Sequence, residues 1–166
     1  MTDFLSQANA LALRYGPSVV TPPTGEPAIK RVGVSNLLAG NNRPVVLSQF
    51  PTIIIFPDGG QFKDSSGTSG GGGGGLRISH SDWLVEFYYR LYPNPPTHPA
   101  QLLDWLSQLV NLPHVAAAQL GARVDHVSTV AWAIPRGGLV YAGTTYEGIR
   151  LNVHMRSSES WTPTAA

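Results

Sequence analysis

The feature that most constrains the fold is a long segment, Leu76 to Tyr92, in which two kinds of side chain alternate. Every second position is apolar or aromatic, and this set is Trp83, Val85, Phe87, Tyr89 and Leu91. Because successive side chains of a β-strand point to opposite faces, the period of two predicts one strand with a buried face. The opposite face carries Leu84, Glu86, Tyr88, Arg90 and Tyr92. This mixture suits contact with a partner protein as well as with water.

Four other segments predict strands. The first, Thr52 to Phe56, is apolar and mostly β-branched between two prolines, which is typical of a buried strand. Val124 to Ile134 and Leu139 to Tyr141 are expected to be joined by a turn at Pro135 to Gly138. The last strand is expected from Tyr146 to Arg156. Its expected inward side chains are Ile149, Leu151, Val153 and Met155. Its expected outward side chains are Arg150, Asn152, His154 and Arg156.

Two segments have the residue spacing of amphipathic helices. Asp3 to Arg14 places apolar side chains on one side, and Gly16-Pro17 stops the helix. Pro99 to Val110 carries a stripe of leucines and begins with a proline, which is favourable in the first turn. The sequence therefore predicts a short N-terminal helix and a second helix between strands.

The connections between these elements are long. Pro17 to Pro44 is rich in Pro, Gly, Thr and Asn, which predicts an irregular connection. Residues 67–75 predict a flexible glycine-rich loop, and residues 157–166 predict a loose polar tail. The order of elements predicts a single α+β domain over residues 1–166. We expect a mixed, mainly antiparallel β-sheet with one long helix packed on it, a second N-terminal helix and long loops.

Charged residues are scarce in this chain. Asp, Glu, Lys and Arg make up 13% of its 166 residues, about half the usual share of roughly 25%. A sparsely charged surface predicts that part of it lies against other subunits. A neutral monomer with a surface of Ser, Thr, Asn and Gln is the alternative.

The composition argues against several classes of protein. The net charge is +1 and no basic run is longer than Lys30-Arg31, so we expect no specific binding of nucleic acid. The chain has no cysteine, which excludes a disulfide framework and thiolate metal sites. The sequence has no stretch of about 20 apolar residues, so we expect no membrane span. Met1 to Phe4 does not resemble the start of a secretory signal.

Two motifs raise the question of catalysis. The glycine run Gly70 to Gly75 is followed by Leu76-Arg77-Ile78, whereas a phosphate-binding loop needs Lys-Ser or Lys-Thr there. Ser79-His80-Ser81-Asp82 holds the residue types of a hydrolase triad. In a strand, however, both serines face one side, and His80 and Asp82 face the other. Neither of these serines stands in the Gly-x-Ser-x-Gly motif that presents a serine nucleophile. We therefore expect no enzymatic activity and no cofactor.

The histidines and acids do not form a ligand set in the sequence. The five histidines are His80, His98, His114, His126 and His154. No two have the helical spacing of a zinc site, so a metal ion would need strands that bring two together, such as His126 with His154. Asp125 and Glu147 are isolated acids. We predict no metal site.

The four tryptophans divide into two groups. Trp83, Trp105 and Trp132 fit the apolar faces of their elements, so we expect them in the core. Trp161 stands in the polar tail, where it has no evident place in a monomer. Docking on a neighbouring subunit and simple disorder remain open for this residue.

Several of these segments together resemble the tail terminator family of long-tailed bacteriophages. They are the strand Pro51 to Pro57, the strand Trp83 to Tyr92, the helix Pro99 to Val110, and the closing phrase Tyr146-Glu147-Gly148-Ile149-Arg150-Leu151 after Leu139-Val140-Tyr141. The resemblance runs from about Ile53 to Arg156. The glycine run and the Pro17 to Pro44 connection depart from the family pattern. These departures leave head-closure (stopper) and other neck or minor tail subunits as alternatives.

The resemblance implies a structural virion protein that forms a hexameric ring, caps the tail tube and joins it to the head connector. Its implied partners are further copies, the tail tube protein and the connector or stopper protein, with DNA passing through the lumen. Its implied location is the neck of the virion, after assembly in the host cytoplasm. The inter-subunit contacts expected on this basis are Leu84, Glu86, Tyr88, Arg90, Arg150, Arg156 and Trp161. The expected flexible assembly loop consists of Gly70, Gly71, Gly72, Gly73, Gly74 and Gly75.

Two functions of other classes compete with this hypothesis. A small hydrolase or lytic enzyme would be built around His80, Asp82 or His126. A ligand-binding module would use the aromatic strand and would need a concave pocket.

Overall fold

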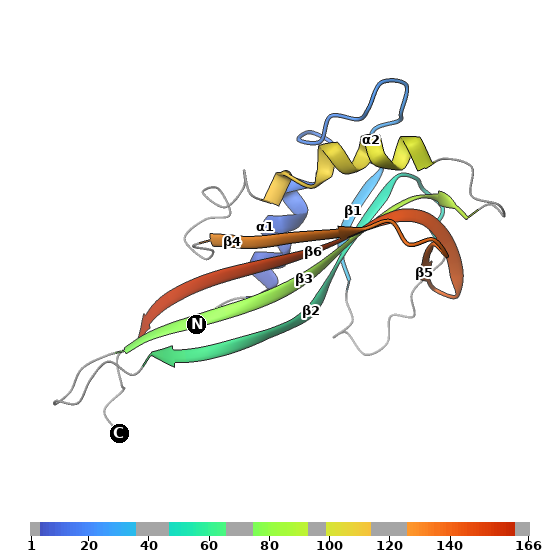
Figure 1. Cartoon of the computed structure of the whole chain (residues 1–166). Coiled ribbons are helices and arrows are strands. Elements are labelled where there is room, and N and C mark those ends of the chain that lie inside the picture. Colours follow the sequence, from blue (N-terminus) through green and yellow to red (C-terminus); the bar gives the residue numbers. More distant parts are fainter. Residues whose placement is uncertain (1–3, 36–46, 66–74, 93–98, 114–125, 162–166) are drawn as a thin grey trace.

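The chain folds into a β-sheet with two helices (Figure 1). The computed structural model describes residues 4–35, 47–65, 75–92, 99–113 and 126–161. Its elements are α1 (Phe4–Arg14), β1 (Arg31–Val34), β2 (Thr52–Ser65), β3 (Gly75–Leu91), α2 (Pro99–Leu109), β4 (His126–Ala133), β5 (Leu139–Tyr141) and β6 (Thr144–Trp161).

The sheet has six strands in the order β1-β2-β3-β6-β4, with β5 paired to β6. Only β1 and β2 run parallel among these pairs, and the others are antiparallel. The α+β class with a mixed, mainly antiparallel sheet is therefore confirmed.

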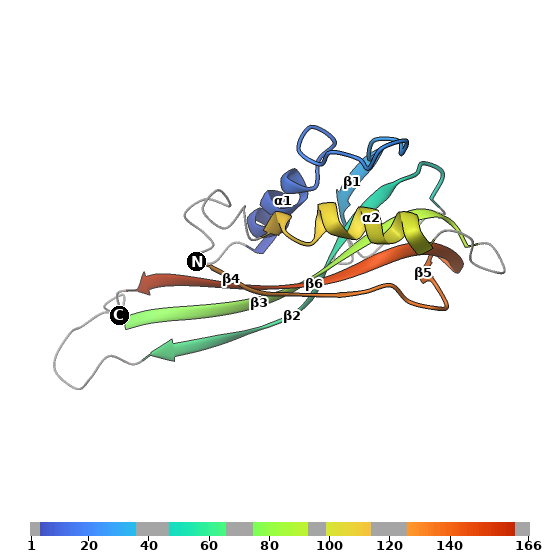
Figure 2. The same cartoon turned by 45° about the horizontal axis from the view of Figure 1, so that its top comes forward.

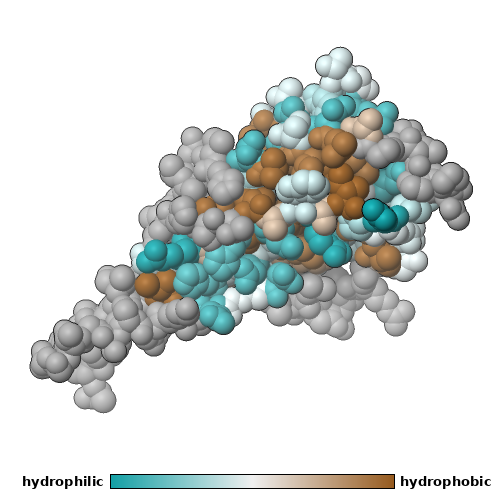
Figure 3. Space-filling view, viewed as in Figure 1, coloured by the Kyte–Doolittle hydropathy of each residue, from teal (hydrophilic) through white to brown (hydrophobic). Residues whose placement is uncertain are grey.

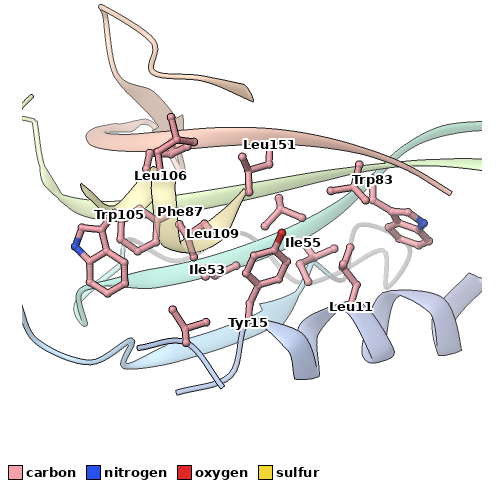
Figure 4. Packing of buried hydrophobic residues seen from close by; sticks show 14 of the residues in the cluster. Leu11, Tyr15, Ile53, Ile55, Trp83, Phe87, Trp105, Leu106, Leu109 and Leu151 are labelled. Atoms are coloured by element: carbon pink, nitrogen blue, oxygen red, sulfur yellow. The ribbon is translucent and has the colours of Figure 1, made fainter. Parts of the chain in front are cut away.

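Both helices lie on one face of the sheet (Figures 1 and 2). The alternation in β3 explains why this face is buried, because Trp83, Val85 and Phe87 all point into the core. On β6 the expected inward set is also buried, and it consists of Ile149, Leu151, Val153 and Met155. Figure 4 shows Leu11 and Tyr15 from the α1 side and Trp105, Leu106 and Leu109 from α2 converging on these strands.

A second, smaller cluster covers part of the opposite face. Tyr88 of β3, Ile54 of β2, Leu139 of β5 and Tyr146 of β6 are its buried members. The hairpin β5–β6 provides this cover. Its two turn residues, Ala142 and Gly143, both have positive φ, the backbone of a tight primed turn. At this end the sheet is thus buried on both faces.

At the other end, three strands continue past the helices. The backbones of Lys63–Ser65 in β2, Gly75–Ile78 in β3 and Ser158–Trp161 in β6 pair side by side there. We call these three segments the arm. In both cartoon views neither helix extends over the arm (Figures 1 and 2). The arm is therefore a single layer of sheet within the described residues.

Several boundaries differ from the sequence-based prediction. Strand β2 does not stop at Phe56 but continues to Ser65, with a register shift between Pro57 and Gly59. The tail does not become loose at Ser157, because β6 runs on to Trp161. Residues 67–74 and 162–166 of the predicted loop and tail lie outside the described residues, whereas Gly75 begins β3.

Two connections also differ. The Pro17 to Pro44 segment contains the short strand β1, which pairs in parallel with β2. The turn at Pro135 to Gly138 exists, with a hydrogen bond from the Gly138 N–H to the Pro135 carbonyl at 2.9 Å. It does not make a hairpin, because β4 and β5 each pair with β6.

Candidate functional site

The polar residues of greatest chemical interest gather on the face of the sheet away from the helices. Asp82 of β3 lies opposite His154 of β6, and His80 lies opposite Arg156. His80 is therefore the diagonal neighbour of His154, which is within reach of a long side chain. The predicted separation of faces is confirmed, since Ser79 and Ser81 are buried on the helix side.

His154 uses both of its ring nitrogens in this cluster. Its Nδ1 is hydrogen-bonded to the Asp82 carboxylate, and its Nε2 lies 3.2 Å from Nδ1 of His80. The two imidazole rings are stacked with centroids 5.3 Å apart. Because a carboxylate accepts, His154 donates from Nδ1, which leaves its Nε2 as an acceptor. Asp82 thus fixes the orientation of the imidazole pair.

The cluster lines an open depression together with Gly60 and Gln61 of β2. Glycine is required at position 60, since a Cβ there would lie 2.6 Å from the His80 carbonyl oxygen. A Cβ at Gly59 would be 3.9 Å from an Asp82 carboxylate oxygen. The two glycines therefore let β2 pair closely with β3 while leaving the three polar side chains uncovered.

A hydrolase triad is not assembled here. The depression is lined by Gly60, Gln61, His80, Asp82 and His154, and none of these is a nucleophile of the serine, threonine or cysteine type. The two neighbouring serines are instead structural. Ser81 donates to the Gln7 side chain of α1 at 2.9 Å, and Ser79 is 2.6 Å from Ser157.

The structure brings a second histidine to His154 that the sequence did not suggest. The strands of His126 and His154 do pair, with His126 opposite Arg156 and Thr129 opposite His154. The contact that the structure describes is with His80, from β3. Only the register between β3 and β6 could have identified it. Across the described part of the chain, no three histidines, cysteines or acids are arranged to hold a metal ion.

Two of the predicted inter-subunit contacts are buried inside the chain. Glu86 is 4% exposed and Tyr88 is 0% exposed. Tyr88 donates its hydroxyl hydrogen to Glu86, and Arg150 also donates to Glu86. The prediction that both residues face a neighbour is therefore wrong, because the β5–β6 hairpin covers this end of the face.

The other predicted contact residues remain at least partly accessible. Leu84, Arg90 and Arg150 are half-buried, and Arg156 is exposed. Arg90 lies over the ring of Tyr89 at 4.5 Å and approaches Glu147 at 3.4 Å. The backbone of Trp161 belongs to β6.

The tryptophans are placed as predicted in two cases of three. Trp83 and Trp105 are buried in the core. Trp132 is 54% exposed on β4, which corrects the prediction that it packs inside. It lies on an edge strand, since β4 pairs only with β6 in the described sheet. In Figure 3, apolar surface gathers over the part that carries α2 and hydrophilic surface predominates over the described sheet toward the arm.

Neither described helix is long enough to cross a membrane, since each has 11 residues. No family model matches the chain. A search of curated proteins finds no match either.

Proposed function

We propose that this chain is a structural subunit of a phage virion, a tail terminator that forms a ring, caps the tail tube and joins it to the head connector. The stopper and other neck or minor tail subunits are the alternatives within the same class. In this proposal the chain needs no cofactor, works in the virion neck and assembles in the host cytoplasm.

The arm is the observation that carries the proposal. Its three strands pair side by side, yet no second layer lies over them among the described residues. A sheet that has only one layer cannot exclude water from either face by itself. A neighbouring subunit that packs on the arm would provide the missing layer.

The outer edge of β4 offers a second patch. Ala131, Trp132 and Ala133 are exposed on this strand, which has its other edge on β6. Among the described residues no strand pairs with this outer edge, and unpaired backbone groups beside a large aromatic side chain are suited to pairing with another chain. Arm and β4 edge are different surfaces, and ring closure by head-to-tail contacts needs two different patches on each subunit.

The competing enzymatic function has one observation in its favour, the Asp82–His154–His80 cluster. An acid that orients an imidazole is the usual support of a general base. The cluster lacks a nucleophile among the residues that line it. Assembly therefore remains the better supported function.

The direct test is capping of tail tubes. Purified tube subunits polymerise with and without this chain, and electron microscopy measures the lengths and ends of the tubes. The proposal expects shorter tubes that carry a ring at one end. Tubes of unchanged length without an added ring would contradict it.

A further inference from the structure

We propose that His80 and His154 form a binding site for a divalent transition metal ion of the Zn²⁺ type, with Asp82 as the positioning residue. The inference depends on the side chains of β3 and β6 alone and does not require the proposed function.

The distance between the two histidines carries the first step. Nδ1 of His80 and Nε2 of His154 are 3.2 Å apart. Two nitrogens that each lie about 2.0–2.1 Å from a tetrahedral Zn²⁺ are separated by roughly 3.3–3.4 Å. The two nitrogens are therefore about as far apart as two ligands of one ion, and the rings would turn so that both lone pairs point at the metal instead of at each other.

The hydrogen bond to Asp82 carries the second step. Metal-binding histidines almost always donate their other ring N–H to a carboxylate, a carbonyl or water. His154 has this arrangement, since its Nδ1 is bonded to Asp82 and its Nε2 faces His80. Asp82 therefore holds His154 in the tautomer that presents a lone pair to the metal.

Metal binding also requires a change of tautomer at His80. In the metal-free pair, one proton lies between His80 Nδ1 and His154 Nε2. When His80 carries this proton on Nε2 instead, its Nδ1 becomes a ligand and the ring stays neutral. No oxidation, reduction or net loss of charge is involved.

The surroundings leave room for the remaining ligands. The depression is open, and Gly60 and Gln61 form its side on β2. Two protein ligands leave two positions of a tetrahedral ion for water or for another molecule. Because the described residues contain no set of three metal ligands, those two positions depend on such molecules. Imidazole nitrogen favours Zn²⁺, Cu²⁺ and Ni²⁺ over Mg²⁺ and Ca²⁺.

One positive side chain opposes the metal. Arg156 lies opposite His80 in the register and is exposed. Like charges on cross-strand neighbours repel each other. Arg156→Gln is therefore expected to bind Zn²⁺ a few-fold more tightly than the original chain.

The test is calorimetric titration of the untagged full chain with Zn²⁺ in metal-free buffer, beside Mg²⁺ as the unfavoured ion. We expect one Zn²⁺ per chain and no heat of binding from Mg²⁺. His80→Asn and His154→Asn are each expected to abolish binding. Asp82→Asn is expected to weaken it by about 10–100-fold, the usual effect of losing such a hydrogen-bond partner. Asn152→Ala is the matched control, because Asn152 is exposed on the same face of β6 two residues from His154.

Thermal unfolding separates loss of the site from loss of the fold. Zn²⁺ should raise the melting temperature of the original chain and of Asn152→Ala, but not that of His154→Asn. Without metal, all these variants should melt alike. Absence of Zn²⁺ binding by the original chain would overturn the proposal. Undiminished binding by the double variant His80→Asn/His154→Asn would overturn it as well, since the ion would then be held elsewhere.

Discussion

Arg150 and Glu86 lie opposite each other on β6 and β3, and two guanidinium nitrogens bind the same carboxylate oxygen. Nε donates to Oε1 at 2.9 Å and Nη2 donates to it at 2.7 Å. Glu86 is almost completely buried, and Tyr88 donates a further hydrogen bond to its other oxygen. The charge of Glu86 is thus held inside the fold by one cation and one hydroxyl group.

Removal of Arg150 should therefore destabilise the fold. In Arg150→Ala the buried carboxylate keeps only the tyrosine as a donor. Loss of one partner of a fully buried pair costs about 3–5 kcal/mol. The side chain of Arg150 is 42% exposed, so we expect a smaller loss of about 2 kcal/mol in the free energy of unfolding. Urea denaturation measures it. Arg156→Ala on the same strand should change stability by less than about 0.5 kcal/mol, and equal losses in both variants would contradict this account.

The polar network between α1 and the sheet should be equally sensitive. Gln7 is 1% exposed, accepts a hydrogen bond from Ser81 and is 3.4 Å from the Ser157 hydroxyl. Gln7→Ala should cost about 2 kcal/mol, because buried polar groups lose their partner. Asn9→Ala on the exposed side of the same helix is the control. Equal melting temperatures for the two variants would show that the network contributes nothing.

Gly148 is a position where no side chain fits. An added Cβ would clash with the Phe87 carbonyl oxygen and would lie 2.6 Å from Cδ1 of Leu139. Gly148→Ala should therefore cost at least about 3 kcal/mol or prevent folding, since a packed sheet has to shift. Gly137→Ala, where a Cβ meets nothing within 4 Å, should be nearly neutral. Soluble yield and denaturation midpoints compare the two, and a stable Gly148→Ala would contradict the packing described.

High pH should destabilise the protein through its buried tyrosines. Burial raises the pKa of Tyr15, and burial followed by the hydrogen bond to Glu86 raises the pKa of Tyr88. Above about pH 10, the ordinary pKa of tyrosine, the unfolded chain loses these protons while the folded chain keeps them. The unfolded state then binds fewer protons than the folded state. The contribution of these tyrosines to the free energy of unfolding is therefore fully present below about pH 10 and is lost as the pH rises further.

Tyr15→Phe tests this linkage with little disturbance. The Tyr15 hydroxyl has no hydrogen-bond partner among the described residues, so its removal should cost little at pH 8. Between pH 10 and 11 the free energy of unfolding of the variant should fall by about 1 kcal/mol less than that of the original chain. Urea denaturation at pH 8, 10 and 11 measures the difference. The same alkaline loss in both proteins would rule out the assigned role of Tyr15.

Two of the three strands of the arm, those of β2 and β3, can be removed without disturbing the core. Phe62 lies opposite Ser79, so Asn-Gly in place of Lys63–Ile78 gives a two-residue hairpin that keeps the register. This variant should melt close to the original chain but should fail to assemble. Shortening only Gly70 to Gly75 should preserve the fold and impair joining to the head. Normal assembly without these two strands would contradict the role of the arm as an interface. Loss of the fold on shortening the glycines would make that loop structural.

Local sequence patterns predicted the fold where every second side chain of a strand is buried. The alternation from Trp83 to Tyr89 and from Ile149 to Met155 matches the buried face of the sheet. Prediction from local patterns failed where hydrogen bonding between strands decides the conformation. Asp58-Gly59-Gly60 has the composition of a loop, yet hydrogen bonds to β3 extend β2 through it to Ser65.

The candidate site could be predicted only in part. The sequence placed His80 and Asp82 on one face. His154, 72 residues from Asp82 along the chain, joins them only because β3 pairs with β6 in this register. The same long-range pairing brings Arg150 to Glu86 and the β5–β6 hairpin over Tyr88. A single strand pattern contains no information about such contacts, so it could not show which half of the mixed face is covered.

The mass of the particle in solution tests the central claim most directly. Native mass spectrometry of the untagged chain, alone and with tail tube subunits, counts the copies in each complex. If neighbouring copies stabilise one another, the chain should form a closed ring in at least one of the two conditions. The family resemblance predicts six subunits in this ring. A protein of 17.7 kDa that stays monomeric in both would contradict the account.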